Sequence, residues 1–258
     1  MVLGDGRFLG LGVMVPVSEA ARAASTAGPG ADVDVSGGLF AFEVDGVEHE
    51  STETLARALR RAVMARAQSK IGDRARLDRF FSGHEDDGSK AKAATAHSDH
   101  LAFQWEPASR RLLVIPPHVL DRRPPTFEEG KHLATLCAAL EGLVELRAGR
   151  AGRLRLVPRS VAAADTLVTP SRRWISVTPY AVTRHAKRLS AHEVIERDVV
   201  AECLRRGFPK PSVTVLEARG VPGRGLEARI QLEFSVAVQG PVALGRTRHL
   251  GGGLFRAE

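Results

Sequence analysis

The sequence has few aromatic residues and few cysteines, and it contains no long apolar run. Phe, Trp and Tyr make up 5% of the 258 residues, so a buried core must rest mainly on Leu, Val and Ala. Cys137 and Cys203 each lie within a helical apolar pattern, which favours two inert thiols in a reducing cytosol over a disulfide. Residues 1–17 lack a basic leader followed by an apolar stretch. These absences predict a cytoplasmic protein with no membrane partner.

The composition is otherwise that of a soluble globular protein, and its charge is unevenly distributed. Hydrophobic residues make up 43% and charged residues 26% of the chain, which is long enough for two small domains. Residues 153–258 hold 18 Lys and Arg against 9 Asp and Glu, which leaves 19 and 21 for residues 1–152. A basic C-terminal half favours a polyanion-binding site there. The alternative is a solvated basic surface that reflects Arg-rich composition.

Apolar periodicity and turn residues predict the order β-α-β-β-α-β in residues 39–160. The first helix carries Leu55 and Val63 on one face, and the second begins at a capping box formed by Thr126 and Glu129. This order is typical of the ferredoxin-like fold. The predicted strands are 39–44, 101–106, 111–115 and 153–157, and the predicted helices are 51–69 and 126–149.

Residues 171–258 repeat part of this order. Strands are predicted at 173–177, 212–217 and 228–238, and a helix is predicted to begin at the Ser190/Glu193 capping box and to end at Gly207. The stretch from Pro241 to Thr247 leaves room only for a turn where a second helix would lie. We therefore expect an α+β protein with two tandem ferredoxin-like (RRM-like, β-α-β-β-α-β) domains and a C-terminal glycine-rich loop.

A glycine-rich pattern occurs near both ends of the chain. Residues 4–14 (GDGRFLGLGVM) and 245–255 (GRTRHLGGGLF) carry Gly, Arg, Leu, Gly and Gly at the same relative places. Glycines at this density let backbone N–H groups approach a phosphate closely, and the arginines add positive charge. Neither copy has the Lys-Ser/Thr of a P-loop, so no nucleotide cofactor is expected. The alternative is a tight glycine turn between strands.

Three segments carry a resemblance to a known family: residues 82–88 (SGHEDDG), residues 176–188 (SVTPYAVTRHAKR) and residues 245–255. With the paired ferredoxin-like domains, they resemble the RAMP superfamily of CRISPR-associated proteins. More narrowly, they resemble the C-terminal part of the fused subunit of type I-G (formerly I-U) systems, in which a backbone-capping domain is joined to an endoribonuclease that cuts CRISPR repeat RNA. The resemblance implies CRISPR repeat RNA and other subunits of a type I surveillance complex as partners.

The resemblance covers nearly the whole chain, yet the chain is short for a member of that family. Residues 1–17 resemble the closing glycine-rich loop of a preceding domain, so the capping domain is expected to be mostly absent, in a shortened form or in a separate gene. Residues 18–38, rich in Ala, Gly and Ser, are expected to form a linker. The two domains are then expected at 39–160 and 171–258.

The resemblance also implies metal-independent cleavage, in which the ribose 2′-OH attacks the adjacent phosphorus and leaves a 2′,3′-cyclic phosphate and a 5′-OH. Histidine suits the base and the acid because its pKa of about 6.5 lies near neutral pH. His84 lies in a glycine-flanked polar loop after the first helix, where the superfamily often places its catalytic base. His84 is therefore the first catalytic candidate, and Asp86 or Asp87 would orient it. His100 and His97, at the end of the same loop, are the reserve candidates.

Other interpretations of this loop stay open. His84, Asp86, Asp87, His97 and His100 include the ligand types that Zn²⁺ or Mn²⁺ takes, although the preferred interpretation needs no metal or other cofactor. Alternatively, residues 83–88 form a capped surface turn in which the aspartates bind local N–H groups.

RNA contacts are expected in the basic half. Tyr180 is suited to stacking on a base, with burial in the core as the alternative, and residues 184–188 form a basic cluster that contacts RNA or is merely solvated. The preferred function is processing of precursor CRISPR RNA; the alternatives are a non-catalytic RNA-binding subunit and a metal-dependent phosphoesterase. The expected RNA-binding residues are Tyr180, Arg184, His185, Lys187, Arg188, Arg246, Arg248, His249, Gly251, Gly252 and Gly253.

Overall fold

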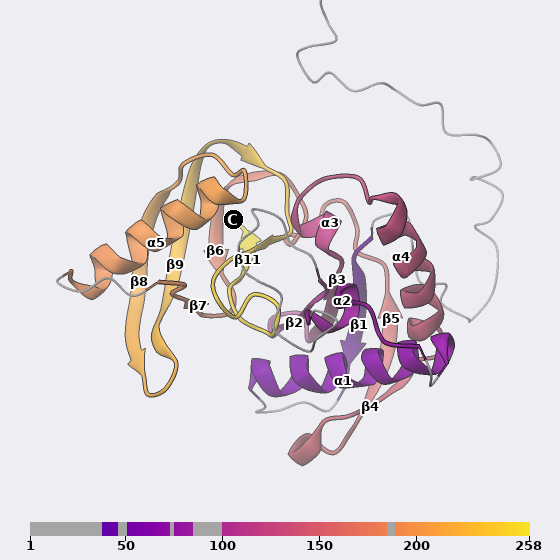
Figure 1. Ribbon diagram of the computed structural model, residues 1–258. Helices are drawn as coiled ribbons and strands as arrows, with labels where there is room; N and C mark the ends of the chain where they lie inside the picture. Colours follow the sequence, from indigo (N-terminus) through magenta and orange to yellow (C-terminus); the bar gives the residue numbers. More distant parts are fainter. Residues whose placement is uncertain (1–37, 46–50, 73–74, 85–99, 185–188) are drawn as a thin grey trace, which may run out of the picture. The chain divides into compact units, whose positions relative to one another are not determined.

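A computed structural model of the chain describes residues 38–45, 51–72, 75–84, 100–184 and 189–258 (Figure 1). These residues form two antiparallel sheets with helices packed on them, which is an α+β arrangement. The predicted linker at 18–38, apart from Gly38, and the N-terminal glycine-rich pattern lie outside the described ranges. Within the described ranges, no helix is both long enough and apolar enough to span a membrane.

The first sheet has the strand order β2-β3-β1-β5-β4 and is antiparallel throughout. Its strands are β1 (Phe40–Val44), β2 (Ala102–Glu106), β3 (Arg111–Ile115), β4 (Glu145–Arg147) and β5 (Arg153–Arg159). Its helices are α1 (Thr52–Ile71), α2 (Arg79–Ser82), α3 (Pro117–Leu120) and α4 (Phe127–Leu140), and a 3-10 turn η3 (Gly149–Ala151) joins β4 to β5.

Helix α4 begins at the capping box that the sequence predicts. Thr126 and Glu129 form the capping box at the start of α4, and Glu129 also accepts two hydrogen bonds of 2.6 Å from Arg123. The Arg123 hydrogen bond lowers the pKa of Glu129 to about 2. The predicted end of α4 was wrong: the helix stops at Leu140, because Gly142 takes a left-handed φ of 67° and turns the chain into β4.

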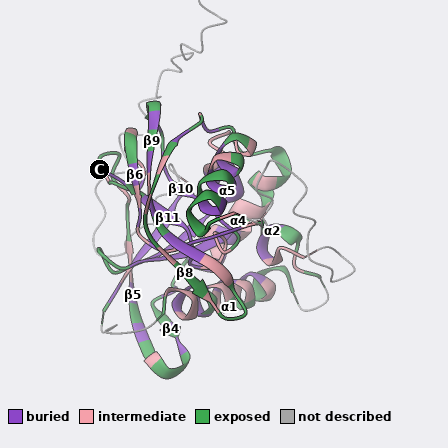
Figure 2. Ribbon diagram, turned by 90° about the vertical axis from the view of Figure 1, so that its left-hand side faces the viewer, coloured by how far each residue is buried: buried purple, intermediate pink, exposed green. Residues whose placement is uncertain are grey.

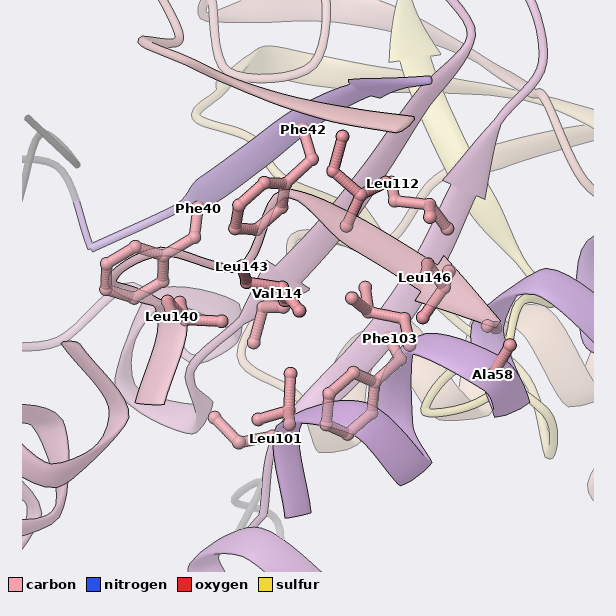
Figure 3. Packing of buried hydrophobic residues seen from close by; sticks show 14 of the residues in the cluster. Phe40, Phe42, Ala58, Leu101, Phe103, Leu112, Val114, Leu140, Leu143 and Leu146 are labelled. Atoms are coloured by element: carbon pink, nitrogen blue, oxygen red, sulfur yellow. The ribbon is translucent and has the colours of Figure 1, made fainter. Parts of the chain in front are cut away.

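The first sheet is covered on both faces. On one face, side chains of α1 and α4 pack against Phe40, Phe42, Phe103 and Val114 (Figure 3). The opposite face packs against Leu167, Ala243 and Leu254, which belong to the second half of the chain, after β5. The other members of this cluster are Leu39, Ala41, Ala102, Leu113, Ile115 and Leu120. Each fully buried Leu, Ile, Val or Phe contributes about 1.5–3 kcal/mol. Burial on both faces explains why every residue of β2 is buried.

The second sheet has the order β10-β11-β6-β9-β7, and β8 pairs with β9. Its elements are β6 (Ser171–Ser176), β7 (Tyr180–Ala181), α5 (Ala191–Arg205), β8 (Ser212–Val221), β9 (Gly225–Val238), β10 (Val242–Ala243) and β11 (Leu254–Ala257). Residues 239–253, all of which are described, contain no helix. A glycine-rich segment, defined as residues 244–253, occupies this part of the chain.

Helix α5 begins at the predicted Ser190/Glu193 capping box. Buried and exposed residues alternate along α5 and α1, as expected of helices that cover a sheet with one face (Figure 2). Ile195, Val199 and Cys203 are all fully buried on that face. Burial raises the pKa of the Cys203 thiol to about 12, so this thiol stays protonated and unreactive, as its apolar sequence context predicts.

Candidate functional site

The glycine-rich segment is hydrogen-bonded to the edge of the first sheet. The backbone N–H of Phe103 in β2 donates to the carbonyl of His249 (3.0 Å), and the N–H of Gly251 donates back to the carbonyl of Phe103 (2.9 Å). Phe103 and Leu250 form a parallel bridge. A segment that belongs to the second half therefore acts as a short additional strand beside β2, and it ties the two halves together.

Gln104 fixes this junction with its side chain. Its amide nitrogen donates to the carbonyls of Gly252 (3.1 Å) and Arg248, and Gln104 is fully buried. Because both neighbours are carbonyl oxygens, the amide nitrogen must face them, which leaves the buried Oε1 without a partner. Sequence reasoning missed Gln104, although an amide in the middle of an apolar strand was a sign of such a role.

The expectation that the glycine N–H groups bind phosphate was wrong. The N–H of Gly251 donates to Phe103, that of Gly252 to the carbonyl of Thr247 (3.2 Å), and that of Gly253 to the carbonyl of Pro179 (2.9 Å). Backbone donors that are already paired within the protein are not available to an RNA phosphate. Gly251, Gly252 and Gly253 are also buried.

Close packing explains the glycines instead. A Cβ on Gly252 would overlap the side chain of Thr247, and a Cβ on Gly253 would overlap the carbonyl of Leu244. A Cβ on Gly251 would lie 2.7 Å from the carbonyl oxygen of Thr52 at the start of α1. Glycine is therefore needed here so that backbones can approach each other, which is the alternative that the sequence left open.

Two histidines that are far apart in sequence meet at this junction. The rings of His100 and His249 lie 3.7 Å apart between centroids, at an interplanar angle of 45°. The Nδ1 atoms lie 3.0 Å (His100) and 3.3 Å (His249) from the carbonyl oxygen of Leu101. These distances favour tautomers in which both Nδ1–H groups donate to Leu101 and each Nε2 carries a lone pair.

His84 belongs to the same region. It follows Gly83, the residue that ends α2 in a left-handed conformation (φ 66°). A Cβ on Gly83 would lie 2.8 Å from Cδ2 of His100, so only glycine lets the end of α2 approach this ring. We call His84, His100 and His249 the histidine cluster. It contains two of the three predicted catalytic residues; His97 lies outside the described residues.

The histidine cluster is electrostatically unusual. Burial holds the pKa of His249 well below its usual 6.5, and the positive charges of Arg248 and His100 act in the same direction. His249 is therefore neutral at neutral pH. Its Nε2 and the Nδ1 of His84 are buried without a hydrogen-bond partner among the described residues. Buried polar atoms that lack a partner are rare in folded proteins, and they often mark functional sites.

Tyr180 corrects another prediction. It was expected to stack on an RNA base, but its side chain is fully buried. The hydroxyl lies 2.6 Å from Oδ2 of Asp198 and 3.2 Å from Oε2 of Glu202, both on α5. Burial and these two carboxylates raise its pKa well above 10. Tyr180 is a core residue and presents no ring face to an RNA base.

Glu202 connects α5 to the glycine-rich segment. It is fully buried, accepts a hydrogen bond of 2.7 Å from the N–H of Gly245, and is paired at 2.9 Å with Nε of Arg206. Nη1 of the half-buried Arg248 lies 4.0 Å from the same carboxylate. Glu202 therefore holds both the start of the segment and the arginine that precedes His249.

The remaining predicted RNA-binding residues are distributed as follows. Arg184 and Arg246 are exposed, and the Arg246 guanidinium donates to the carbonyl of Arg224. His185, Lys187 and Arg188 lie outside the described residues.

The metal-site alternative receives no support from the described residues. No group of three or more His, Cys, Asp or Glu side chains in these ranges is placed to hold a metal ion. Asp86, Asp87 and His97, which that alternative would need, lie outside them.

Comparison with known proteins gives little. No protein-family model and no curated protein matches the chain. One similar solved structure is described as "An RAMP protein binding different RNA substrates"; it is 11% identical, the match covers 84% of this chain and 98% of that chain, and the TM-score is 0.43. At this identity and TM-score, the likeness carries no weight in assigning a family or an activity to this chain.

Proposed function

We propose that this chain is an RNA-binding protein of the RAMP type that processes precursor CRISPR RNA as a metal-independent endoribonuclease. The observation that carries the proposal is the histidine cluster: the His100 and His249 rings are in contact at the junction of the two halves, and Gly83, the neighbour of His84, packs against the His100 ring. The cleaved RNA would stay bound within a type I surveillance complex, of which this chain would be one subunit.

The strand orders support the fold part of the proposal. The orders β2-β3-β1-β5 and β8-β9-β6-β11 are each the order expected of an antiparallel β-α-β-β-α-β unit. In the second unit, the glycine-rich segment replaces the second helix. We therefore regard both halves as ferredoxin-like, the second as a variant in which the helix is lost and the segment docks on the neighbouring unit.

The chemistry that the cluster supports is transfer of the RNA phosphodiester to its own 2′-oxygen. One imidazole accepts the 2′-OH proton as that oxygen attacks phosphorus; the bond from phosphorus to the 5′-oxygen breaks, and a protonated imidazole gives its proton to the leaving oxygen. We assign one of these proton transfers to His84, which is partly exposed; His100 is also partly exposed, but its ring is packed between Gly83 and His249. His100 is the second candidate for proton transfer.

Arg248 is suited to neutralising the charge that develops on the phosphate. It precedes His249 directly and is half-buried, and a guanidinium in a partly desolvated site interacts more strongly with a phosphorane than an exposed one does. The Glu202 carboxylate, 4.0 Å from Nη1 of Arg248, restricts how far this guanidinium can move toward a phosphate.

The second candidate function is binding of RNA without cleavage. It is favoured by the burial of His249 Nε2 and His84 Nδ1, because a catalytic nitrogen must reach its substrate. Under this alternative, the cluster only joins the glycine-rich segment to β2.

A panel of end-labelled RNA hairpins of CRISPR-repeat length, incubated with the protein with and without EDTA, separates the functions. Cleavage that persists in EDTA and leaves a 2′,3′-cyclic phosphate supports the endoribonuclease. Binding without cleavage supports the non-catalytic subunit. Cleavage that EDTA abolishes would contradict the proposal and favour a metal-dependent phosphoesterase.

A further inference from the structure

Two arginines pair with one carboxylate on the surface, and a third arginine is hydrogen-bonded to the backbone of one of them. Glu53, in the first turn of α1, is paired with Arg57 one turn further on, at 2.6 Å. Its other oxygen is paired with Arg224 at the tip of the β8–β9 hairpin. Arg246 of the glycine-rich segment donates to the carbonyl of Arg224. We call Arg57, Arg224 and Arg246 the arginine cluster.

The arginine cluster is exposed and has an excess of positive charge. The side chains of Arg57 and Arg224 are 53% and 55% exposed, against 25% for Glu53, and Arg246 is also exposed. Although burial works to raise the pKa of Glu53, hydrogen bonds and charge from Arg57 and Arg224 outweigh it and lower the pKa. Glu53 is therefore ionised at neutral pH; it pairs with Arg57 and Arg224 and offsets only one of the three positive charges of the cluster.

The ion pair between Glu43 and Arg159 shows what an ordinary surface pair looks like in this chain. It joins one acid to one base across β1 and β5 at 2.7 Å, with 54% and 43% of the two side chains exposed. Its charges cancel, whereas the arginine cluster keeps a net charge of two even with Glu53 in place. An uncompensated group of exposed guanidinium groups is suited to a phosphate, whose oxygens accept paired hydrogen bonds from arginine.

The cluster is also continuous with the proposed cleavage site. Gly251 lies against Thr52 and Ala56 of the same helix turn that carries Glu53 and Arg57. The glycine-rich segment thus runs from Arg246 in the cluster to His249 beside His100. A nucleic-acid strand that reaches the histidines has the arginine cluster beside it.

From this arrangement we infer that the arginine cluster binds a backbone phosphate of the RNA next to the scissile one, and that Glu53 occupies this phosphate site in the free protein. The inference rests on the proposed function, because RNA is its ligand. Exposed ion pairs add little net stability, so a phosphate can replace the Glu53 carboxylate at small cost. Glu53 then acts as a competitor that weakens RNA binding while it keeps the guanidinium groups in place.

The test is fluorescence anisotropy with a labelled repeat-length RNA hairpin, measured over a range of salt concentrations in a His84→Ala background that suppresses cleavage. Arg224→Ala should weaken binding by about 3- to 10-fold at ~0.1 M salt and reduce the salt slope by about one. Glu53→Gln should strengthen binding by about 2- to 10-fold, because one repulsive charge is removed. The matched controls Arg159→Ala and Glu43→Gln should each change the affinity by less than about twofold.

The outcomes distinguish the inference from the proposed function. If the parent protein binds RNA but Arg224→Ala and Glu53→Gln behave like their controls, the inference is wrong and the proposed function stands. If these variants change binding of heparin but not of RNA, the cluster is a site for another polyanion and the inference is also wrong. If the parent protein binds no RNA in the panel, the proposed function fails and the inference fails with it. Thermal melts should show all four variants folded, since the altered side chains lie on the surface.

Discussion

The imidazole of His100 lies against that of His249, with 3.7 Å between ring centroids. His100 lies two residues before the start of β2, whereas His249 lies in the glycine-rich segment near the end of the described chain. Their contact depends on the hydrogen bonds that join Phe103 to the segment. Protonating both rings would bring two positive charges together, so the contact disfavours a pair in which both imidazoles are charged.

Stability should therefore decrease in mild acid. Burial lowers the pKa of His249 in the folded state, so the unfolded chain binds more protons below about pH 6.5. The free energy of unfolding should fall as the pH drops below that value, by up to about 1.4 kcal/mol per pH unit for one histidine.

Chemical denaturation between pH 7.5 and 5 measures this effect. His249→Gln should show a shallower decrease than the wild-type protein. His118 should also lower the free energy of unfolding in acid, because burial lowers its pKa as well. The variant His118→Gln measures that contribution separately. Equal pH slopes for wild type and His249→Gln would contradict the account of His249.

Replacement of Gly252 should destabilise the fold rather than remove a phosphate contact. An Ala Cβ at this position would overlap Thr247, and forced overpacking typically costs about 1–3 kcal/mol. Gly220→Ala in β8 is the matched control, since nothing lies within 4 Å of its Cβ position; it should be neutral or slightly stabilising. Equal unfolding free energies for the two variants would show that Gly252 is not needed for close packing.

Tyr180→Phe separates a structural role from base stacking. The substitution keeps the ring but removes the hydroxyl that bonds Asp198 and Glu202. Loss of a hydrogen bond to buried carboxylates should lower the free energy of unfolding by about 1–3 kcal/mol, as measured by urea denaturation. A residue that only stacks on RNA bases would tolerate Phe without loss of stability, so an unchanged value would argue for the original prediction.

Local features of the fold could be predicted from the sequence, and long-range contacts could not. The capping boxes at Thr126 and Ser190 depend on residues three positions apart, and both are present. The docking of the glycine-rich segment on β2 depends on Gln104 and Phe103, far away in the sequence, and no local pattern indicates that pairing. For the same reason, the glycines were predicted to bind phosphate when they in fact allow close backbone packing.

In the candidate site, too, local features could be predicted from the sequence and long-range contacts could not. His84 and His100 were selected because of their loop, and their proximity through Gly83 is consistent with one site. The neutral state of His249 was not predictable, because it results from burial beneath parts of the chain distant in sequence. Tyr180 was misassigned because its partners, Asp198 and Glu202, lie on a helix whose inward face appeared from its sequence to be only apolar.

The central claim is that the histidine cluster transfers protons during metal-independent RNA cleavage. Single-turnover cleavage of a labelled repeat hairpin in EDTA, by wild type and His84→Ala, tests it most directly. The account predicts that His84→Ala cleaves about 10²–10⁴ times more slowly, with RNA affinity unchanged within about twofold. Cleavage by His84→Ala at the wild-type rate would contradict the assignment of proton transfer to His84.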